Sequence, residues 1–351
     1  MATMKNIADQ LGISINAVSL ALNDKAGVSE ELRRQVLRTA DEIGYISSKE
    51  KYVKTFRKTN LCIMLQKLYN TDLYFYSKVM FAVTDEARKN GYDSIVHFFD
   101  DSDMTIANAL EEKRVAGLIV IGKISDENIR RLLTYQIPMI LVDHASFEIP
   151  LNCVITDNKS GGYMACKYLL EKGFEDIGFF GDLAYSLSIR DRYFGFLQAI
   201  RQYAPHLEEK AMELSITGDM EHYVLKNRPE GIYEILKTRK VLPKAFVCSN
   251  DIAALTLCTA LRRLYLTVPQ DISLIGFDNT TLSEVAAPPL TTVNVRMSEM
   301  GKKAVRRLIQ IISHKDTSIE TIMMGVNLVI RDTVGMPFTP DRPASERHRP
   351  D

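Results

Sequence analysis

Strand-length apolar segments alternate with longer amphipathic segments from residue 61 to residue 313, and this alternation restricts the fold more than any other feature of the chain. Alternation of this kind predicts parallel sheets that helices cover on both faces. The predicted strands are residues 61–65, 94–99, 117–121, 139–142, 154–156, 177–180, 214–217, 245–249, 272–277 and 291–295. The predicted helices are residues 75–90, 105–113, 126–135, 160–172, 190–203, 229–238, 251–264 and 298–313.

The length of this α/β region favours two lobes, because about 270 residues exceed what one doubly wound sheet commonly holds. We expect the chain to pass between the lobes near Asp157 and again near Leu290. Residues 336–351 are rich in proline and lack apolar periodicity, which predicts a disordered tail.

The N-terminal 45 residues carry helical segments and no strand. Residues 5–11 and 14–23 each place apolar side chains at helical spacing, and Gly12 between them allows a turn. Ser14 is positioned to cap the second helix. The pair predicts a helix-turn-helix unit, although an ordinary helical hairpin has the same pattern.

A third amphipathic segment favours the helix-turn-helix interpretation. Ser29 is positioned to cap it, and Gly44 is positioned to end it. A three-helix unit of about 45 residues has the size of a DNA-binding headpiece. The polar face of residues 14–23 would then be available to a DNA groove.

Several separated motifs in this region occur in one known family. They are I-A-D-Q-L-G-I-S, A-V-S-L-A-L-N, G-V-S-E-E-L-R and D-E-I-G-Y, between Met4 and Tyr45. The run resembles the headpiece of the lactose/galactose repressor (LacI/GalR) family. Similar stretches further along are V-A-G-L-I-V-I-G, I-P-M-I-L-V-D-H, D-N-K-S-G-G-Y-M-A, S-N-D-I-A-A-L, I-G-F-D-N and P-P-L-T-T-V, so the resemblance covers residues 3 to about 333.

The resemblance implies an all-α helix-turn-helix headpiece followed by an α/β core of two Rossmann-like lobes, periplasmic-binding-protein-like, type I. The expected domains are a headpiece at 1–46, a basic hinge at 47–60, a two-lobed core at 61–335 and the tail at 336–351. The N-lobe is expected at about 61–157 and 291–318, and the C-lobe at about 158–290 and 319–335. The implied partners are double-stranded DNA with a palindromic operator, a small-molecule effector such as a sugar, and a second copy of the chain in a homodimer.

On the DNA side, the resemblance implies contacts from Thr3, Ser14, Ile15, Asn16, Ser19 and Asn23. Asn16 suits an adenine edge, and Ile15 suits a thymine methyl group unless it is a core residue of the headpiece. Leu20 stands where the family frequently has an arginine, so a contact that relatives use is missing here.

The segment after the headpiece departs further from the family. Lys54 occupies the place of a leucine that wedges into the minor groove in relatives. Either Val53 or Phe56 replaces that wedge, or Lys51, Lys54 and their basic neighbours bind phosphates without kinking the DNA. We favour the second interpretation.

On the effector side, the resemblance implies contacts from Tyr74, Phe75, Asp157, Arg192, Met220, Asn250 and Asp278. Arg192 offers a donor fork, Asn250 a donor and an acceptor, and Asp278 an acceptor, which together suit a sugar in a cleft between two lobes. Met220 replaces a stacking aromatic residue that relatives often carry, with Tyr223 nearby as a substitute.

Structural interpretations compete at several of these positions. Asn250 and Asp251 are also positioned to cap the helix that follows them, and Asp191 could form a surface pair. Gly161 and Gly162 favour close helix packing over phosphate binding, because the spacing of a phosphate-binding loop is absent. His144 has no metal-ligand spacing and is interpreted as structural.

Composition limits the function classes. Basic and acidic residues balance at 44 each, so DNA binding would depend on a local basic footprint doubled in a dimer. Five scattered cysteines predict reduced thiols in a cytoplasmic protein, and no apolar run reaches the ~18 residues that cross a bilayer. We expect no cofactor, no metal and no catalytic residues.

Two rival classes remain open. A solute-binding receptor would share the two-lobed core but would have no use for the headpiece. An enzyme on Rossmann-type lobes would need a nucleophile paired with a base, and the sequence shows no such pair.

Overall fold

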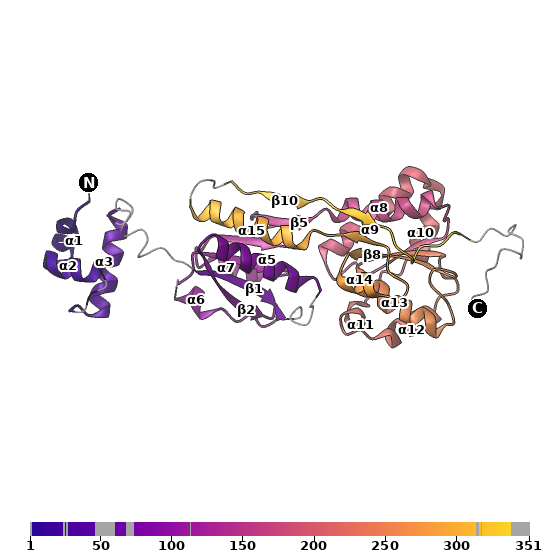
Figure 1. Ribbon diagram of the computed structural model, residues 1–351, viewed down its shortest axis with the longest axis horizontal. Coiled ribbons are helices and arrows are strands. Elements are labelled where there is room, and N and C mark those ends of the chain that lie inside the picture. Colours follow the sequence, from indigo (N-terminus) through magenta and orange to yellow (C-terminus); the bar gives the residue numbers. More distant parts are fainter. Residues whose placement is uncertain are drawn as a thin grey trace, which may run out of the picture. The chain divides into compact units, whose positions relative to one another are not determined.

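The computed structural model describes residues 2–23, 25, 27–45, 60–67, 74–112, 114–313, 316 and 318–337. The chain divides into two compact units, Met1–Thr59 and Asn60–Asp351. The first unit is the headpiece and the second contains the two lobes of the core (Figure 1).

In the described residues of the headpiece, three helices pack into a bundle, as the sequence predicts. They are α1 (Met4–Leu11), α2 (Ile15–Leu22) and α3 (Glu30–Glu42). Ile7, Val18, Leu22 and Val36 are fully buried where the helices meet. Gly12 has a φ of 63°, a left-handed conformation that favours glycine, and it makes the turn between α1 and α2.

Two helix starts in the headpiece have the predicted caps. Ser14 Oγ accepts a hydrogen bond from the backbone N–H of Ala17 at 3.1 Å, and Ser29 Oγ accepts one from Leu32 at 3.2 Å. Each bond satisfies a backbone donor that has no partner within the helix. The predicted cap positions are therefore confirmed.

The N-lobe contains a six-stranded parallel sheet in the order β10-β5-β4-β3-β1-β2. Its strands are β1 (Asn60–Gln66), β2 (Asp93–Phe99), β3 (Gly117–Ile121), β4 (Met139–Val142), β5 (Cys153–Thr156) and β10 (Thr321–Met324). Leu61 and Ile63 pack in one hydrophobic cluster while Cys62 and Met64 pack in another. Both faces of β1 are therefore buried, which explains its continuous apolar sequence.

Helices cover both faces of this sheet (Figure 1). They are α5 (Tyr76–Lys89), α6 (Asn108–Glu111), α7 (Asp126–Leu133) and α15 (Met297–Ile312). Val79 and Val83 of α5 join Leu308 of α15 in the cluster on one face, and Ile129 of α7 joins Leu110 of α6 on the other.

The C-lobe contains a five-stranded sheet in the order β11-β9-β8-β7-β6, in which only β11 is antiparallel to its neighbour. Its strands are β6 (Ile177–Phe180), β7 (Ala245–Cys248), β8 (Ser273–Asp278), β9 (Thr292–Asn294) and β11 (Asn327–Val329). Its helices are α8 (Asn158–Glu171), α9 (Leu187–Tyr203), η2 (Pro205–Leu207), α10 (Glu208–Leu214), α11 (Glu221–Leu225), α12 (Pro229–Lys237), α13 (Asp251–Arg263) and α14 (Thr281–Val285).

The predicted strand at 214–217 is wrong. Leu214 is the last residue of α10, and only Ile216 pairs with the sheet, through one isolated bridge to Phe180. The Ser215 hydroxyl donates to the carbonyl of Ala211 and accepts from the N–H of Phe179, so the segment leaves the helix before a strand can extend. Strands β10 and β11 and helices α10, α11 and α14 are additional to those predicted.

The chain passes between the two lobes three times. The first passage lies between β5 and α8, at Asp157. The second follows β9, because Thr292–Asn294 pair with β8 of the C-lobe, so the assignment of residues 291–294 to the N-lobe is corrected. The third lies between β10 and β11, because β10 pairs with β5, so residues 319–324 belong to the N-lobe and not to the C-lobe.

The cysteines and the lengths of the helices bear on the sequence predictions. All five cysteines are buried and free. Among the described helices, none is long and apolar enough to span a bilayer. Residues 47–59 of the hinge predicted at 47–60 and residues 338–351 of the tail predicted at 336–351 lie outside the described residues, and Asn60 begins β1.

Candidate functional site

A cavity of about 200 Å³ lies between the two lobes. The N-lobe supplies Phe75, Tyr76, Lys123, Asp143, His144, Ala145, Phe147 and Ile155. The C-lobe supplies Asn158, Tyr185, Ser186, Leu187, Ser188, Ile189, Asp191, Arg192, Glu221, Val224, Leu225, Asn250, Ile252, Asp278 and Thr280. Most of the polar groups follow the carboxyl ends of parallel strands, where α/β lobes commonly bind ligands.

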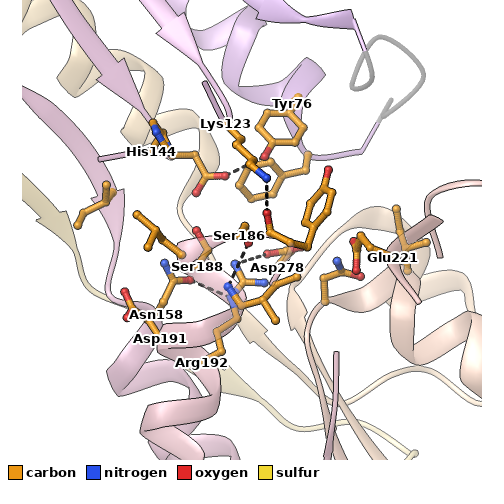
Figure 2. A pocket seen from close by; sticks show the side chains of 18 of the residues that line it. Tyr76, Lys123, His144, Asn158, Ser186, Ser188, Asp191, Arg192, Glu221 and Asp278 are labelled. Atoms are coloured by element: carbon orange, nitrogen blue, oxygen red, sulfur yellow. Dashed lines mark hydrogen bonds and ion pairs between the residues drawn. The ribbon is translucent and has the colours of Figure 1, made fainter. Parts of the chain in front are cut away.

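Arg192 is the most extensively held side chain of the cavity (Figure 2). Its Nε donates to Asn158 Oδ1 at 2.8 Å, and its Nη1 donates to the carbonyl of Ser249. Its Nη2 lies 3.5 Å from Asp278 Oδ1, and its guanidinium stacks 3.8 Å from the ring centroid of Phe277. Arg192 is only 5% exposed, so these contacts fix the orientation of its charged fork.

Asp278 ends β8 with a φ of 111°, which residues other than glycine rarely adopt. The carboxylate is 9% exposed and lies at the cavity beside Arg192. A strained backbone that positions an acidic acceptor is typical of functional sites.

Asn250 caps a helix, which is the structural alternative given above, and it also lines the cavity. Its Oδ1 accepts from the N–H of Ala253 at 2.7 Å, so it caps α13 as predicted. Asp251 does not share this capping role. Its carboxylate accepts from the N–H and hydroxyl of Thr280 and from the hydroxyl of Thr292, and burial raises its pKa to about 6.

Lys123 of the N-lobe wall reaches the C-lobe (Figure 2). Lys123 Nζ donates to the backbone carbonyl of Tyr185 at 2.7 Å, and Tyr76 donates through its hydroxyl to Asp143 Oδ2 at 3.0 Å. Burial lowers the pKa of His144, which keeps its imidazole neutral at neutral pH. A second bridge between the lobes joins Lys78 Nζ to the hydroxyl of Thr281 at 3.3 Å.

Glu221 is the most unusual ionisable group of the cavity. It is 3% exposed, and burial, with a further contribution from Asp182, raises its pKa to about 7 although Arg192 lowers it. Within the described part of the chain, its Oε2 has no hydrogen-bond partner.

We expect the Glu221→Gln variant to gain stability over the unchanged protein as pH rises. The folded protein holds a proton on Glu221 up to about pH 7, whereas the usual glutamate pKa is 4.5. Between pH 4.5 and about pH 7, the folded protein therefore holds a proton on Glu221 that the unfolded chain has released. As pH rises through this range, the free energy of unfolding falls by about 3 kcal/mol because of this group alone. Thermal unfolding of both proteins from about pH 5 to about pH 8 tests this, since the difference isolates Glu221 from the other titrating groups. A difference in unfolding midpoint that is independent of pH would contradict the prediction.

Four of the seven predicted effector residues line the cavity: Phe75, Arg192, Asn250 and Asp278. The other three, Tyr74, Asp157 and Met220, are not among the residues that line the cavity. Asp157 Oδ1 accepts from the N–H of Ser160 and caps α8, and Met220 is 1% exposed within the hydrophobic core of the C-lobe. Tyr74 lies before α5 and is not part of the cavity wall, and Tyr223 does not replace Met220 there.

Sequence reasoning missed other lining residues, some of which carried a signal. Lys123 lies two residues after β3 and Asp143 directly after β4, near the strand ends where ligand sites form. Asp191 was interpreted as a possible surface pair, but it is partly buried and lines the cavity. Glu221 begins a short helix that the sequence did not predict, so nothing in its context pointed to the cavity.

The interpretation of Gly161 and Gly162 as helix-packing residues is confirmed. A Cβ on Gly162 would lie 1.9 Å from the backbone oxygen of Arg192, and one on Gly195 would lie 1.9 Å from that of Lys159. Helices α8 and α9 therefore touch through their backbones. This close contact brings Asn158 and Arg192 together at the cavity.

The predicted DNA-reading residues lie on or beside α2. Ile15 is 48% exposed and Asn16 is also exposed, so Ile15 is not a core residue of the headpiece. Ser19 is partly buried. Asn23 Nδ2 donates to the backbone carbonyl of Ser19 at 2.7 Å.

Two other predicted contacts have structural roles at helix starts. Thr3 and Asn6 form a reciprocal cap of α1, and Ser14 caps α2. Both hydroxyls lie at exposed positions next to the N-termini of these helices. Lys51 and Lys54 lie outside the described residues.

The remaining chemistry of the described residues is limited. No group of three or more histidine, cysteine or acidic side chains in the described ranges could hold a metal ion. Burial raises the pKa of all five cysteine thiols, which makes them poor nucleophiles.

Two family signatures match the chain. Residues 3–48 match the family described as bacterial regulatory proteins, lacI family, and residues 166–334 match a periplasmic binding protein-like domain. The first covers the helices of the headpiece, and the second covers most of the C-lobe together with α15 and β10 of the N-lobe.

Curated relatives match over almost the whole chain. The HTH-type transcriptional repressor PurR of Histophilus somni (strain 129Pt) is 31% identical, over 95% of this chain and 99% of its own length. The repressor of the same name from Vibrio vulnificus is 30% identical, with the same coverage of both chains.

Solved structures share the fold. The lac repressor dimer bound to operator and the anti-inducer ONPF has a TM-score of 0.66 at 21% identity, covering 95% of this chain and 98% of that one. The CelR–cellobiose complex has a TM-score of 0.65 at 21% identity, covering 95% and 100%. A LacI family regulator from Enterococcus faecium with bound ribose has a TM-score of 0.67 at 23% identity, covering 80% and 100%.

The headpiece, the two-lobed core and the full-length match to repressors agree with the resemblance found in the sequence, and neither the receptor nor the enzyme class is favoured. The chain belongs to the lacI family of bacterial regulatory proteins, and it is a DNA-binding transcriptional regulator.

Proposed function

We propose that the chain is a homodimeric repressor that reads a palindromic operator with α2 and responds to a small polyhydroxylated effector in the cleft between its lobes. The observation that carries the proposal is the cavity itself, where fixed donors and acceptors from both lobes converge. Related regulators are described with cellobiose and with ribose, and a lac repressor dimer is described with its operator. The proposed activity is regulated binding, in the cytoplasm, and not catalysis.

The dimer is supported by exposed apolar side chains on the N-lobe. Phe81 on α5 is 67% exposed, and Val96 and Phe98 on the edge strand β2 are 39% and 43% exposed. Side chains of this size are commonly covered by a partner. Burial of this surface against a second copy would pair two headpieces for the two half-sites of an operator.

The effector response is proposed to act through the arrangement of the lobes. The Lys123–Tyr185 and Lys78–Thr281 bonds join the lobes across the cleft, so a ligand that prefers one separation of the lobes shifts their equilibrium. The headpieces of the dimer would receive this shift through residues 46–59.

Enrichment of operator DNA from random duplexes tests the proposal. The full chain should enrich a palindromic sequence, and its affinity should fall steeply with salt because phosphate contacts release counterions. Failure to enrich any palindrome would remove the repressor assignment.

We expect the Asn16→Ala variant to lose sequence discrimination. The exposed amide is suited to an adenine edge, and a bidentate contact of this kind contributes about 1–3 kcal/mol of discrimination. Affinity for the enriched operator should fall about tenfold or more, while affinity for unrelated DNA should change little, as measured by fluorescence anisotropy. The control is Gln35→Ala, which removes an exposed amide from α3. Equal losses in the two variants would show that Asn16 does not read bases.

A further inference from the structure

The cavity contains more carboxylates than cations. Its acidic side chains are Asp143, Asp191, Glu221 and Asp278, and its cationic side chains are Lys123 and Arg192. Both cations are already engaged, Lys123 with the carbonyl of Tyr185 and Arg192 with Asn158, Ser249 and Asp278. An anionic ligand would therefore enter a field of like charge with no uncommitted cation among the lining residues.

Glu221 is a buried acidic group of the cavity, with one oxygen left unsatisfied by the described residues. It is the first residue of α11 and is 97% buried, and its Oε2 accepts no hydrogen bond from any described residue. Asp182 raises the pKa of Glu221 and Arg192 lowers it, but Nε and Nη1 of Arg192 donate to other partners. In the view of Figure 2, Glu221 lies on the far side of Asp278 from Asn158.

A buried carboxyl oxygen without a donor costs free energy, and folded proteins retain such groups where they serve a ligand. Glu221 lines the cavity, so a ligand that fills the cleft would lie against this side chain. A hydroxyl or an ammonium group would supply the missing donor, whereas a carboxylate or phosphate would add repulsion.

We propose that Glu221 is a specificity-determining residue of the cleft: it accepts a hydrogen bond from a donor group of a neutral or cationic polyhydroxylated effector, and it excludes anionic sugar derivatives. This inference rests on the proposed function of the cleft as an effector site. It adds the charge class of the ligand and the residue that selects it.

The experiment uses the full chain and a panel of matched compounds at about pH 8, where Glu221, with its pKa of about 7, is ionised. Glucose, glucosamine, gluconate and glucose 6-phosphate form one series, and ribose and ribose 5-phosphate form another. Thermal unfolding identifies the members that bind, and titration calorimetry measures their dissociation constants. The variants are Glu221→Gln, which keeps the size of the side chain, and the control Glu213→Gln, which removes an exposed carboxylate from α10.

We expect a neutral or amino member to raise the unfolding midpoint and the anionic members to have no effect. Glu221→Gln should weaken the best binder about tenfold or more, because a charge-assisted hydrogen bond is lost. A sugar hydroxyl as the donor predicts that glucose or ribose binds best, and an ammonium predicts glucosamine. Glu213→Gln should bind as the unchanged protein does.

Three results would overturn the proposal: an anionic member that binds best, a panel in which no member raises the midpoint, or equal affinities in the two variants. Enrichment of operator DNA, performed without any panel compound, reports on the repressor assignment separately. A chain that enriches a palindrome but binds its ligand independently of Glu221 would disprove this inference alone.

Discussion

Replacement of Gly195 by alanine is expected to lower the midpoint of thermal unfolding by about 8–16 °C. The added Cβ would lie 1.9 Å from the backbone oxygen of Lys159 and 2.8 Å from the backbone nitrogen of Tyr163. Neither backbone atom can move without shifting helix α8, so the cost should reach the upper range for point substitutions, about 4 kcal/mol. A loss of 1 kcal/mol lowers the midpoint by about 2–4 °C in domains approaching this size.

The matched control is Gly218→Ala. A Cβ on Gly218 would meet no atom within 4 Å, so the same chemical change should alter the midpoint little. Calorimetry of the two variants separates the steric effect at Gly195 from the general effect of adding a methyl group. Similar midpoints for both variants would show that α8 and α9 can separate at low cost.

The Asp278→Asn variant is expected to lose most of its response to effector. The substitution keeps the size of the side chain, and asparagine tolerates the positive φ of this position better than most residues. It removes the charge that faces Arg192, and it replaces one of the two acceptor oxygens open to a ligand hydroxyl with an amide donor. Loss of a hydrogen bond to a charged group weakens binding by about 1.5–3 kcal/mol, or roughly ten- to a hundredfold.

Titration calorimetry with the best binder of the sugar panel measures this loss directly. Release of the enriched operator by the same compound measures its consequence for regulation. The control is Asp332→Asn, an exposed carboxylate of the C-lobe that does not line the cavity. An unchanged dissociation constant in Asp278→Asn would place the effector elsewhere.

Much of the fold was predictable because its strands are buried on both faces. The bounds of β3, β4 and β6 were predicted without error, since continuous apolar runs ended by polar residues leave little choice. The edge strands β10 and β11 were missed because they lack this burial. Their side chains are exposed or only partly buried, so no apolar run marks them.

The candidate site was predictable where it coincides with strand ends. Asn250 and Asp278 stand at the ends of β7 and β8, and both line the cavity. Met220 was predicted by position alone, and one residue decides the outcome: Met220 packs into the core while its neighbour Glu221 lines the cavity. The direction of a side chain at the start of a short, weakly patterned helix depends on tertiary packing that a single sequence does not reveal.

The three passages of the chain between the lobes have a mechanical consequence. Two lobes joined by a single connecting segment can rotate about almost any axis, but three connecting segments oppose twisting and sliding of one lobe against the other. The connections at Asp157, after Asn294 and after Met324 therefore leave bending as the softest relative motion of the lobes. A ligand that closes the cleft would therefore mainly bend one lobe toward the other. The response would be a displacement of the lobes in one direction and not a loss of mobility throughout the core.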